Sequence, residues 1–563
     1  MNFLIFTASY ILISISVIGY GLIFNTTIFK YQKRINFGYA GILGIFILMI
    51  YSYISSFFIS HNIYHNTLII LVGILFFCLN FIRNFKINKS NYLILLLVFS
   101  TLFIANLAFK TNEDFPYYHF NYTMLLVEGS LPFGIGIFNH GFRTPSSLFY
   151  LNSLFYLPFI KFYSFQMTAI LIMGLCNFVL LRKIFNFTKK NKLNFINYLT
   201  LLSFTFINVV FYRIAEHGTD RSAQILIFVL IIELLILVNF FSIKTYKKNF
   251  SRILLLIAIT ISLKAFYILY LVFVFYALFF LYKKIKLLKI IQDNLILLLS
   301  FGILIFLVLL TNLQNSGCLL YPVNFTCLGE LPWAFSEEEL KQMSTHYENW
   351  AKAGAGPGFR VMDAETYIQN FNWVGNWMKL YFQEKGLNTT GGILSIALIT
   401  IFTFYSKTKN IDKKNKFKFI LFIIFLLFIE WFWKHPAFRY GGFCLLALLI
   451  FFPTSLMIER YYHKTFNTRV IALVILTTLI FVSRNISRIS SEIEKYDYQP
   501  IKTVFYYVNT DGNENYFVQN KIIYNLINAF NECNKKQNNT EYNCDLINKK
   551  VGTVYNKYFF KKN

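Results

Sequence analysis

The sequence predicts an all-α protein that crosses a membrane many times, and three observations lead to that fold class. Only 14% of its 563 residues are charged and 56% are hydrophobic, whereas charged residues make up about 25% of an ordinary soluble domain. Apolar runs of roughly 20 residues, the length that crosses a bilayer, follow one another along most of the chain. Lysine and arginine gather between these runs, as they do in the loops of membrane proteins.

The apolar runs define the expected helices, about 13–14 in all. The first run lacks a basic start and a small-residue cleavage site, so it is expected to be a span and not a signal peptide. The run 252–281 is too long for one upright helix and short for two, so we expect a tight hairpin or a broken pair around Lys264. The other spans are expected at 3–24, 37–59, 66–84, 91–109, 162–182, 194–212, 222–243, 293–312, 390–406, 417–433, 437–458 and 469–486.

The charge pattern predicts the topology. A net charge of +27 would favour nucleic-acid binding in a soluble protein, but no basic block is interleaved with aromatic residues, so no nucleic-acid partner is expected. The basic residues fall in alternate connections, which the positive-inside rule assigns to the cytoplasm; a nucleotide-biased genome is an alternative source of part of the excess. The connections expected outside, with both chain ends, are 110–161, 213–221, 313–389, 434–436 and the polar tail from 487.

The seven cysteines show no CxxC pair and no Cys/His spacing typical of zinc. Cys318 with Cys327, and Cys533 with Cys544, are close pairs in stretches expected outside. Disulfides persist in oxidising compartments, so each pair is expected either as a disulfide or as free thiols.

The adjacent carboxylates Glu113 and Asp114 lie just beyond an apolar run. Carboxylates near hydrocarbon are costly and persist where they face water, a partner or a substrate. Two apolar-polar stretches follow, 117–128 and 146–161, which are too short to span and suit helices lying in the membrane interface. A lipid-borne substrate would present its head group beside such a loop.

Three other connections carry candidate binding residues. The loop 213–221 is dense in ionisable groups, which either contact a sugar, an ion or a phosphate or neutralise one another near head groups. Lys264 is an intramembrane cation and therefore a site hypothesis, or else it marks the water-facing tip of a hairpin. Arg439 precedes Gly441 and Gly442, where a ligand can approach the backbone closely. The long loop 313–389 holds a helix opened by a capping box and is expected to act as a lid or an acceptor-binding element.

At these residues the chain resembles the GT-C superfamily of membrane glycosyltransferases, in which an acidic motif lies in the first external loop after a helix that runs outward. Glu113 and Asp114, after the span 91–109, match that motif in order and chemistry. The resemblance implies a polyprenyl-phosphate-linked sugar as donor, a glycan, lipid or protein as acceptor, and inversion at the sugar. It implies that Asp114 is the base and that Glu113 orients it or holds a divalent metal. The residues carried over as candidate donor contacts are His119, Arg143, His217, Asp220, Arg221, Lys264, His435 and Arg439.

The chain departs from the family pattern at its start, because three spans precede the acidic loop's own helix. We therefore expect an accessory bundle over 1–88, a GT-C-like catalytic module over 89–486 and a small external domain over 487–563. The expected location is a bacterial inner membrane, with the site facing the periplasm or the exterior. Glu113, Asp114, His217, Asp220 and Arg439 are expected to converge on one cavity.

Two other classes of function remain open from the sequence. A transporter or flippase of lipid-linked saccharides would use the loop cations without a catalytic base, although no internal repeat supports it. A non-catalytic envelope assembly protein would act through the region 487–563.

Overall fold

The structure, a computed structural model, describes most of the chain. The described residues are 2–27, 36–108, 114–190, 194–216, 218–354, 363–384, 390–406, 416–461, 467–496, 499–502, 518–535, 542–554 and 557–562.

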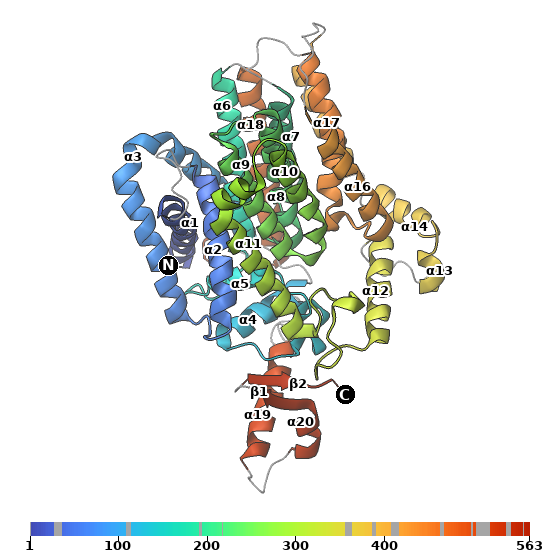
Figure 1. The fold of residues 1–563 in the computed structure, drawn as a ribbon. Coiled ribbons are helices and arrows are strands. Elements are labelled where there is room, and N and C mark those ends of the chain that lie inside the picture. The colour runs from blue at the N-terminus through green and yellow to red at the C-terminus, as the bar shows by residue number, and fades with distance from the viewer. Residues whose placement is uncertain are drawn as a thin grey trace.

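Apolar helices form the body of the protein, and every expected run coincides with one (Figure 1). The all-α polytopic membrane fold is therefore confirmed. The helices of the body are α1 (Asn2–Thr27), α2 (Phe37–Ser56), α3 (Ile63–Leu107), α6 (Met167–Lys190), α7 (Phe195–Val210), α8 (Gly218–Asn239), α9 (Tyr246–Leu263), α10 (Val272–Tyr282), α11 (Leu287–Ser316), α15 (Thr390–Phe404), α16 (Lys418–Lys434), α17 (Gly442–Arg460) and α18 (Asn467–Tyr496).

Fewer helices than expected are both long enough and apolar enough to cross a membrane by themselves. Among the described residues, ten segments are long and apolar enough to cross a membrane. α7 and α15 have 16 and 15 residues, and α9 carries Lys247, Lys248 and Arg252 in its first turns. These four- to five-turn helices still pack in the body, so the larger number of crossings stays a prediction.

Helix α3 contains two of the expected spans without a loop between them. It is helical over all 45 residues, yet the Tyr92 ring lies 5.0 Å from the ring of Phe81 and 6.2 Å from that of Phe77. Residues so far apart in sequence touch only because the helix bends back on itself, as the arch of α3 in Figure 1 shows. The expected boundary at 88/89 thus falls inside a helix.

The run 252–281 forms a hairpin with an irregular second arm. α9 ends at Lys264, whose backbone is extended, and the 3-10 helix η5 (Ala265–Leu271) leads into α10. Lys264 therefore stands at the break between the two arms.

The two sets of connections lie at opposite ends of the body. Among the connections expected outside, Arg143 contacts Tyr321, and Asp114 contacts Arg439, which lies just after the connection 434–436. Among the others, Asn239 and Lys416 exchange two hydrogen bonds. We call these the Asp114 end and the Asn239 end.

Short elements cover the Asp114 end. They are the π-helix η1 (Phe115–His119), α4 (Phe120–Glu128), α5 (Ser147–Ser153), α12 (Glu337–Lys352), α13 (Ala364–Ile368) and α14 (Val374–Met378). Every residue of α5, and every residue of α4 before Glu128, is buried in the protein. The expectation that both lie in the membrane interface is therefore wrong, because even their polar side chains bond inside the protein: Asn121 donates to the carbonyl of Pro116, and Asn152 accepts from the hydroxyl of Thr168.

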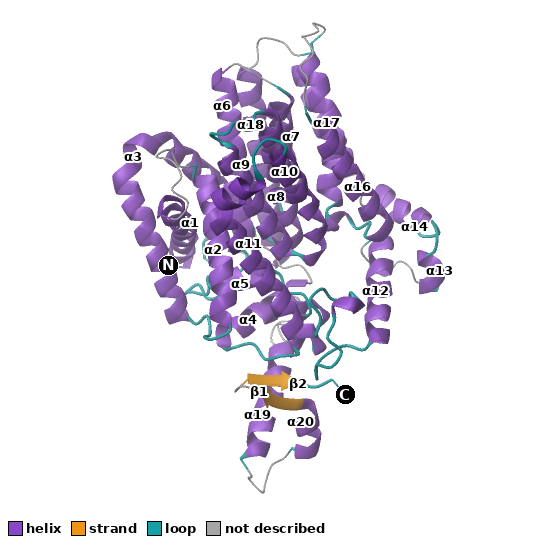
Figure 2. Ribbon diagram, in the orientation of Figure 1, coloured by secondary structure: helices purple, strands orange, loops and turns teal. Residues whose placement is uncertain are grey.

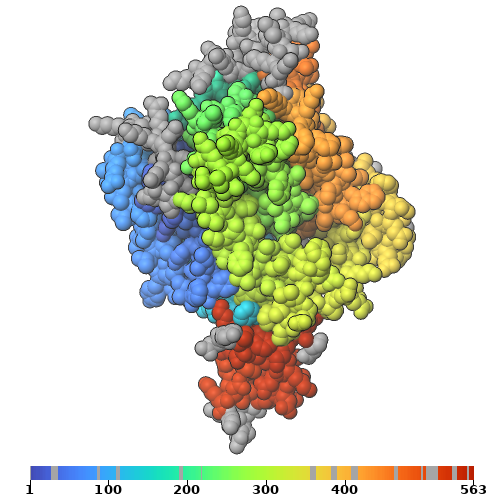
Figure 3. Space-filling view, in the orientation of Figure 1, coloured from blue at the N-terminus to red at the C-terminus, as the bar shows by residue number. Residues whose placement is uncertain are grey.

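The C-terminal region forms a small unit at the Asp114 end, drawn in red in Figure 3. It contains α19 (Val518–Asn534), α20 (Cys544–Lys550) and the hairpin of β1 (Val551–Val554) and β2 (Lys557–Phe560), which is the one sheet of the described chain (Figure 2). The N–H of Phe133 donates to the carbonyl of Tyr558, and the N–H of Phe560 donates to that of Phe133. Disulfides join Cys533 to Cys544 and Cys318 to Cys327. Because α18 continues to Tyr496, the unit begins later than residue 487.

Candidate functional site

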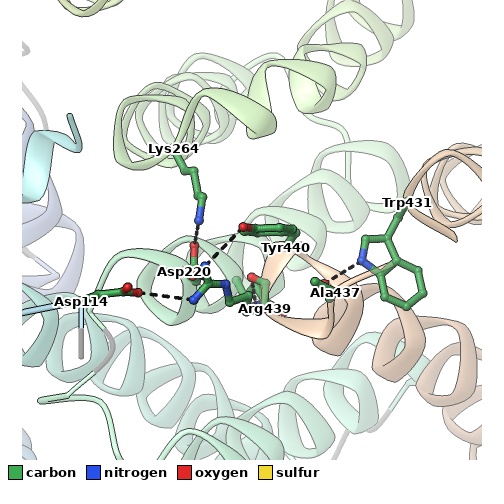
Figure 4. Close-up of polar contacts among 8 residues, drawn as sticks. Asp114, Asp220, Lys264, Trp431, Ala437, Arg439 and Tyr440 are labelled. Carbon is green, nitrogen blue, oxygen red and sulfur yellow. Dashed lines mark hydrogen bonds and ion pairs between the residues drawn. The ribbon is translucent and has the colours of Figure 1, made fainter. Parts of the chain in front are cut away.

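Four charged residues from distant parts of the chain meet at the Asp114 end (Figure 4). An Nη of Arg439 lies 3.4 Å from a carboxylate oxygen of Asp114. The Nε of Arg439 lies 3.8 Å from Asp220, and the Nζ of Lys264 lies 2.5 Å from the other oxygen of Asp220. We call Asp114, Asp220, Lys264 and Arg439 the ion-pair cluster.

Each member of the ion-pair cluster occupies the end of an element. Asp114 directly precedes η1, and Asp220 lies in the first turn of α8, where the helix dipole favours a carboxylate. Lys264 stands at the break between α9 and η5. Arg439 lies in the 3-10 turn η9 (Phe438–Tyr440) before α17. Side chains at such ends leave the packed helices and can meet a ligand.

The turn that carries Arg439 is held by contacts to α8 and α16. Gln224, one turn after Asp220, donates to the carbonyl of Arg439 and accepts from the N–H of Cys444, both at 3.0 Å. The indole of Trp431 donates to the carbonyl of Ala437 at 3.0 Å. Gly441 has φ +99, and a Cβ there would lie 3.1 Å from the hydroxyl of Tyr270, so only glycine fits this turn.

Aromatic rings border the cations of the ion-pair cluster. The guanidinium of Arg439 lies 4.4 Å from the ring centre of Trp350 on α12, and the Nζ of Lys264 lies 4.3 Å from that of Tyr440. Rings at these distances attract cations. The side chains of Asp114, Arg439 and Lys264 are 34%, 36% and 30% exposed, whereas Asp220 is 12% exposed. Asp220 is thus a fixed internal partner, and the other three remain open to a ligand.

His119 lies buried beside the ion-pair cluster. Its ring packs against Tyr118 and Phe149, and its Nε2 has no hydrogen-bond partner among the described residues. Burial lowers the pKa of His119 to about 4, although the carboxylates of Asp114 and Asp220 oppose that shift. The imidazole is therefore neutral at neutral pH and adds no positive charge to the site.

We expect acid to destabilise the protein partly through His119. The unfolded imidazole gains a proton as the pH falls below its ordinary pKa of 6.5, but the folded one stays neutral until about 4. The free energy of unfolding should therefore fall by about 2 kcal/mol between about pH 7 and about pH 5 because of this residue. Denaturation in detergent at the two pH values measures this loss, and His119→Gln should remove it.

The control for this pH effect is His346→Gln, which changes an exposed histidine. His61 is also buried with a lowered pKa, about 3, so the His119 variant should keep part of the acid sensitivity. A pH dependence identical to that of the wild type would contradict the assignment.

Three predicted contact residues are engaged elsewhere. Arg143 donates to the carbonyl of Gly136 at 3.0 Å and to the hydroxyl of Tyr321 at 2.6 Å. Arg221 donates to the carbonyl of Arg213. It points away from the ion-pair cluster, because its side chain is turned by about 100° around the axis of α8 from that of Asp220. His435 lies 3.4 Å from Glu430. None of these three contacts the ion-pair cluster in the described structure, and Glu113 and His217 lie outside the described residues.

Arg488 of α18 is a positioning residue that the sequence did not reveal. Its guanidinium donates to the carbonyl of Ala108 at 2.6 Å and pairs with Glu216, whose side chain is 2% exposed. Ala108 ends the helix before the acidic loop, and Glu216 precedes Asp220 in the chain. Arg488 thus joins the two segments that lead to the carboxylates of the site. No local pattern could show this, since the contacts are 272 and 380 residues apart in sequence.

The described residues contain no group of three His, Cys, Asp or Glu side chains that could hold a metal ion. Asp114 and Asp220 instead face Arg439 and Lys264. The role of Glu113 as a metal ligand stays a prediction.

Comparison with known proteins gives a family but no activity. A family model described as a domain of unknown function (DUF8201) matches residues 1–446. No curated protein and no solved structure matches the chain. The matched range includes all four members of the ion-pair cluster and stops before α18 and the C-terminal unit.

Proposed function

The chain belongs to the DUF8201 family, whose function is unknown, and from its own site we propose that it is a membrane glycosyltransferase. It would move a sugar from a polyprenyl-phosphate-linked donor to a glycan, lipid or protein acceptor. The observation that carries this proposal is the contact of Asp114, a partly exposed carboxylate, with Arg439 beside the pair of Lys264 and Asp220, at one end of an apolar helical body. Such a site offers a base and a phosphate anchor beside the lipid.

Asp114 is the proposed base. The acceptor hydroxyl attacks the anomeric carbon and its proton passes to the carboxylate of Asp114. The bond between that carbon and the phosphate oxygen breaks, and its electron pair leaves with the polyprenyl phosphate. Only one carboxylate is needed for this inverting reaction. Asp220 is not the base, because Lys264 and Arg439 already engage both of its oxygens.

Arg439 and Lys264 are the proposed contacts to the donor phosphate. Negative charge grows on the departing phosphate, and fixed cations stabilise it most where water is scarce. A guanidinium suits phosphate because its planar fork donates two hydrogen bonds together. In the structure Arg439 faces Asp114 at 3.4 Å. A phosphate that takes Arg439 would release Asp114 to act as a base, so donor binding would prepare the site for the acceptor.

We propose that the Asp114 end faces the periplasm or the exterior of a bacterial inner membrane. Both disulfides lie at that end, and disulfides persist in oxidising compartments. The basic connections at the Asn239 end agree with a cytoplasmic location under the positive-inside rule. The polyprenyl chain would remain in the bilayer while its phosphate reaches the ion-pair cluster.

Replacing Arg439 by glutamine is expected to raise the KM for the donor by roughly 10- to 100-fold. That change corresponds to the loss of a charge-assisted hydrogen bond, about 1.5–3 kcal/mol. The measurement is sugar transfer from labelled polyprenyl-phosphate sugars by the purified protein, with native membranes supplying acceptors. Lys434→Gln is the control, because Lys434 is an exposed cation near the same turn.

Two results, one from that assay and one from a transport measurement in proteoliposomes, would decide against the proposal. An Arg439→Gln variant with an unchanged donor KM removes Arg439 from the donor site. A wild-type protein that carries intact donor across the bilayer of proteoliposomes but transfers no sugar is a flippase and not a transferase.

A further inference from the structure

A second group of charged residues lies deep between helices near the Asn239 end. The carboxylate of Glu233 on α8 is fully buried and pairs with Lys183 of α6 at 2.5 Å and with Arg252 of α9 at 3.3 Å. The hydroxyl of Tyr39 on α2 donates to the same carboxylate at 2.5 Å. One side chain therefore ties four helices together. Glu233 lies 13 residues beyond Asp220 on α8, about 20 Å along the helix axis, so this group is separate from the ion-pair cluster.

The positive charge in this group exceeds the negative charge. Lys248 lies one turn before Arg252 on α9, is half-buried, and makes no ion pair with any described residue. The side chains of Lys183 and Arg252 are only 13% and 16% exposed. Asp293 on α11, another acid that faces α9, accepts from the hydroxyl of Tyr246. Two cations thus pair with the one buried carboxylate, and Lys248 adds a third cation one turn away along α9.

Such an excess is costly unless an anion joins it. Like charges four residues apart on a helix repel each other, and partial burial strengthens the repulsion because less water screens it. Glu233 already accepts from three donors, so it has little capacity left for Lys248. A bound anion would neutralise the remaining charge.

We propose that Lys183, Lys248 and Arg252 bind the phosphate of an anionic phospholipid head group. Glu233 lies six residues before the end of α8 at Asn239, about 9 Å inside that end, a depth that lipid head groups reach. α6 and α8 are apolar helices long enough to cross a membrane, and basic pockets between transmembrane helices bind acidic head groups. The lipid would hold α6, α8 and α9 together at the end opposite the ion-pair cluster. This binding site does not depend on the proposed transferase activity.

The test is the thermal unfolding midpoint of the full-length protein in a neutral detergent, titrated with phosphatidylglycerol, phosphatidylcholine or inorganic phosphate. Phosphatidylglycerol should raise the Tm of the wild type by about 3 °C or more, because a ligand that binds only the folded state stabilises it. Phosphatidylcholine and inorganic phosphate should not. Lys248→Gln should lose most of the shift while keeping or slightly raising the Tm without lipid, since it removes a repulsion and breaks no ion pair.

Lys244→Gln is the matched control, because Lys244 is an exposed lysine at the same end, four residues before Lys248. It should keep the full shift. Equal shifts in the Lys248 variant and the wild type would overturn the site. If both lysine variants lose the Tm shift equally, the lipid is attracted unspecifically to the basic surface and the site is overturned. If inorganic phosphate raises the Tm as much as phosphatidylglycerol does, the assignment to a lipid is overturned.

Discussion

Replacing Asp114 by asparagine is expected to lower kcat for sugar transfer by about 10²- to 10⁴-fold, the usual contribution of a general base. Asparagine has the shape of aspartate but cannot accept the proton of the acceptor hydroxyl. The protein should still fold, because Asp114 is 34% exposed and its contact to Arg439 at 3.4 Å is long. Exposed ion pairs of this kind contribute about 1 kcal/mol or less to stability.

The kinetic signature separates Asp114 from Arg439. In the Asp114→Asn variant Arg439 loses a competing carboxylate, so the KM for the donor should stay the same or fall while kcat collapses. In the Arg439→Gln variant the donor KM should rise. Asp545→Asn in the C-terminal unit is the matched control, since Asp545 is an exposed aspartate of α20 outside the site. Transfer by the Asp114 variant at the wild-type rate would end the proposal that Asp114 is the base.

The sequence predicted the helices well because a membrane span is a local property. Length and hydropathy of a run decide it, and neither depends on the rest of the chain. The bend of α3 was not predictable in the same way. Basic residues near position 86 indicate where the chain turns back, but not whether the turn is a loop or stays helical.

The candidate site was only partly predictable, because a charge in an apolar setting shows that it needs a partner but does not name the partner. That signal selected Lys264, whose partner proves to be Asp220 of the ionisable loop 213–221. The family resemblance selected Arg143, which instead binds Gly136 and Tyr321. Trp350 gave no signal at all, since it lies on an amphipathic helix far along the chain.

Unlike Trp350, Glu233 could have been identified as a candidate site residue from the sequence. It is the one acid inside the expected span 222–243, and an ionisable residue inside a span is a site hypothesis by default. Its partners Lys183 and Arg252 lie at the borders of expected spans, where the positive-inside rule alone accounts for basic residues.

Replacing Glu233 by alanine is expected to lower the free energy of unfolding by about 3–5 kcal/mol, the usual cost of removing one partner of a buried ion pair. Lys183 and Arg252 would then face each other and Lys248 with no carboxylate between them. Stability against heat or denaturant in detergent measures the loss, and Glu337→Ala, in the exposed first turn of α12, is the control. A Glu233 variant as stable as that control would show that the carboxylate does not hold the helices.

Two rescue experiments separate the missing charge from the missing packing. In the first, Lys183 and Arg252 are changed to methionine in the Glu233→Leu background, which removes the two unpaired cations. The protein should regain stability, because replacing all members of a buried ion pair by apolar side chains is often neutral or stabilising. Phosphatidylglycerol should also restore part of the stability of Glu233→Ala, because the lipid phosphate would supply the negative charge that the variant lacks. The lipid should therefore stabilise the variant more than the wild type. If phosphatidylglycerol stabilises the two proteins equally, the carboxylate and the lipid phosphate do not share the same cations.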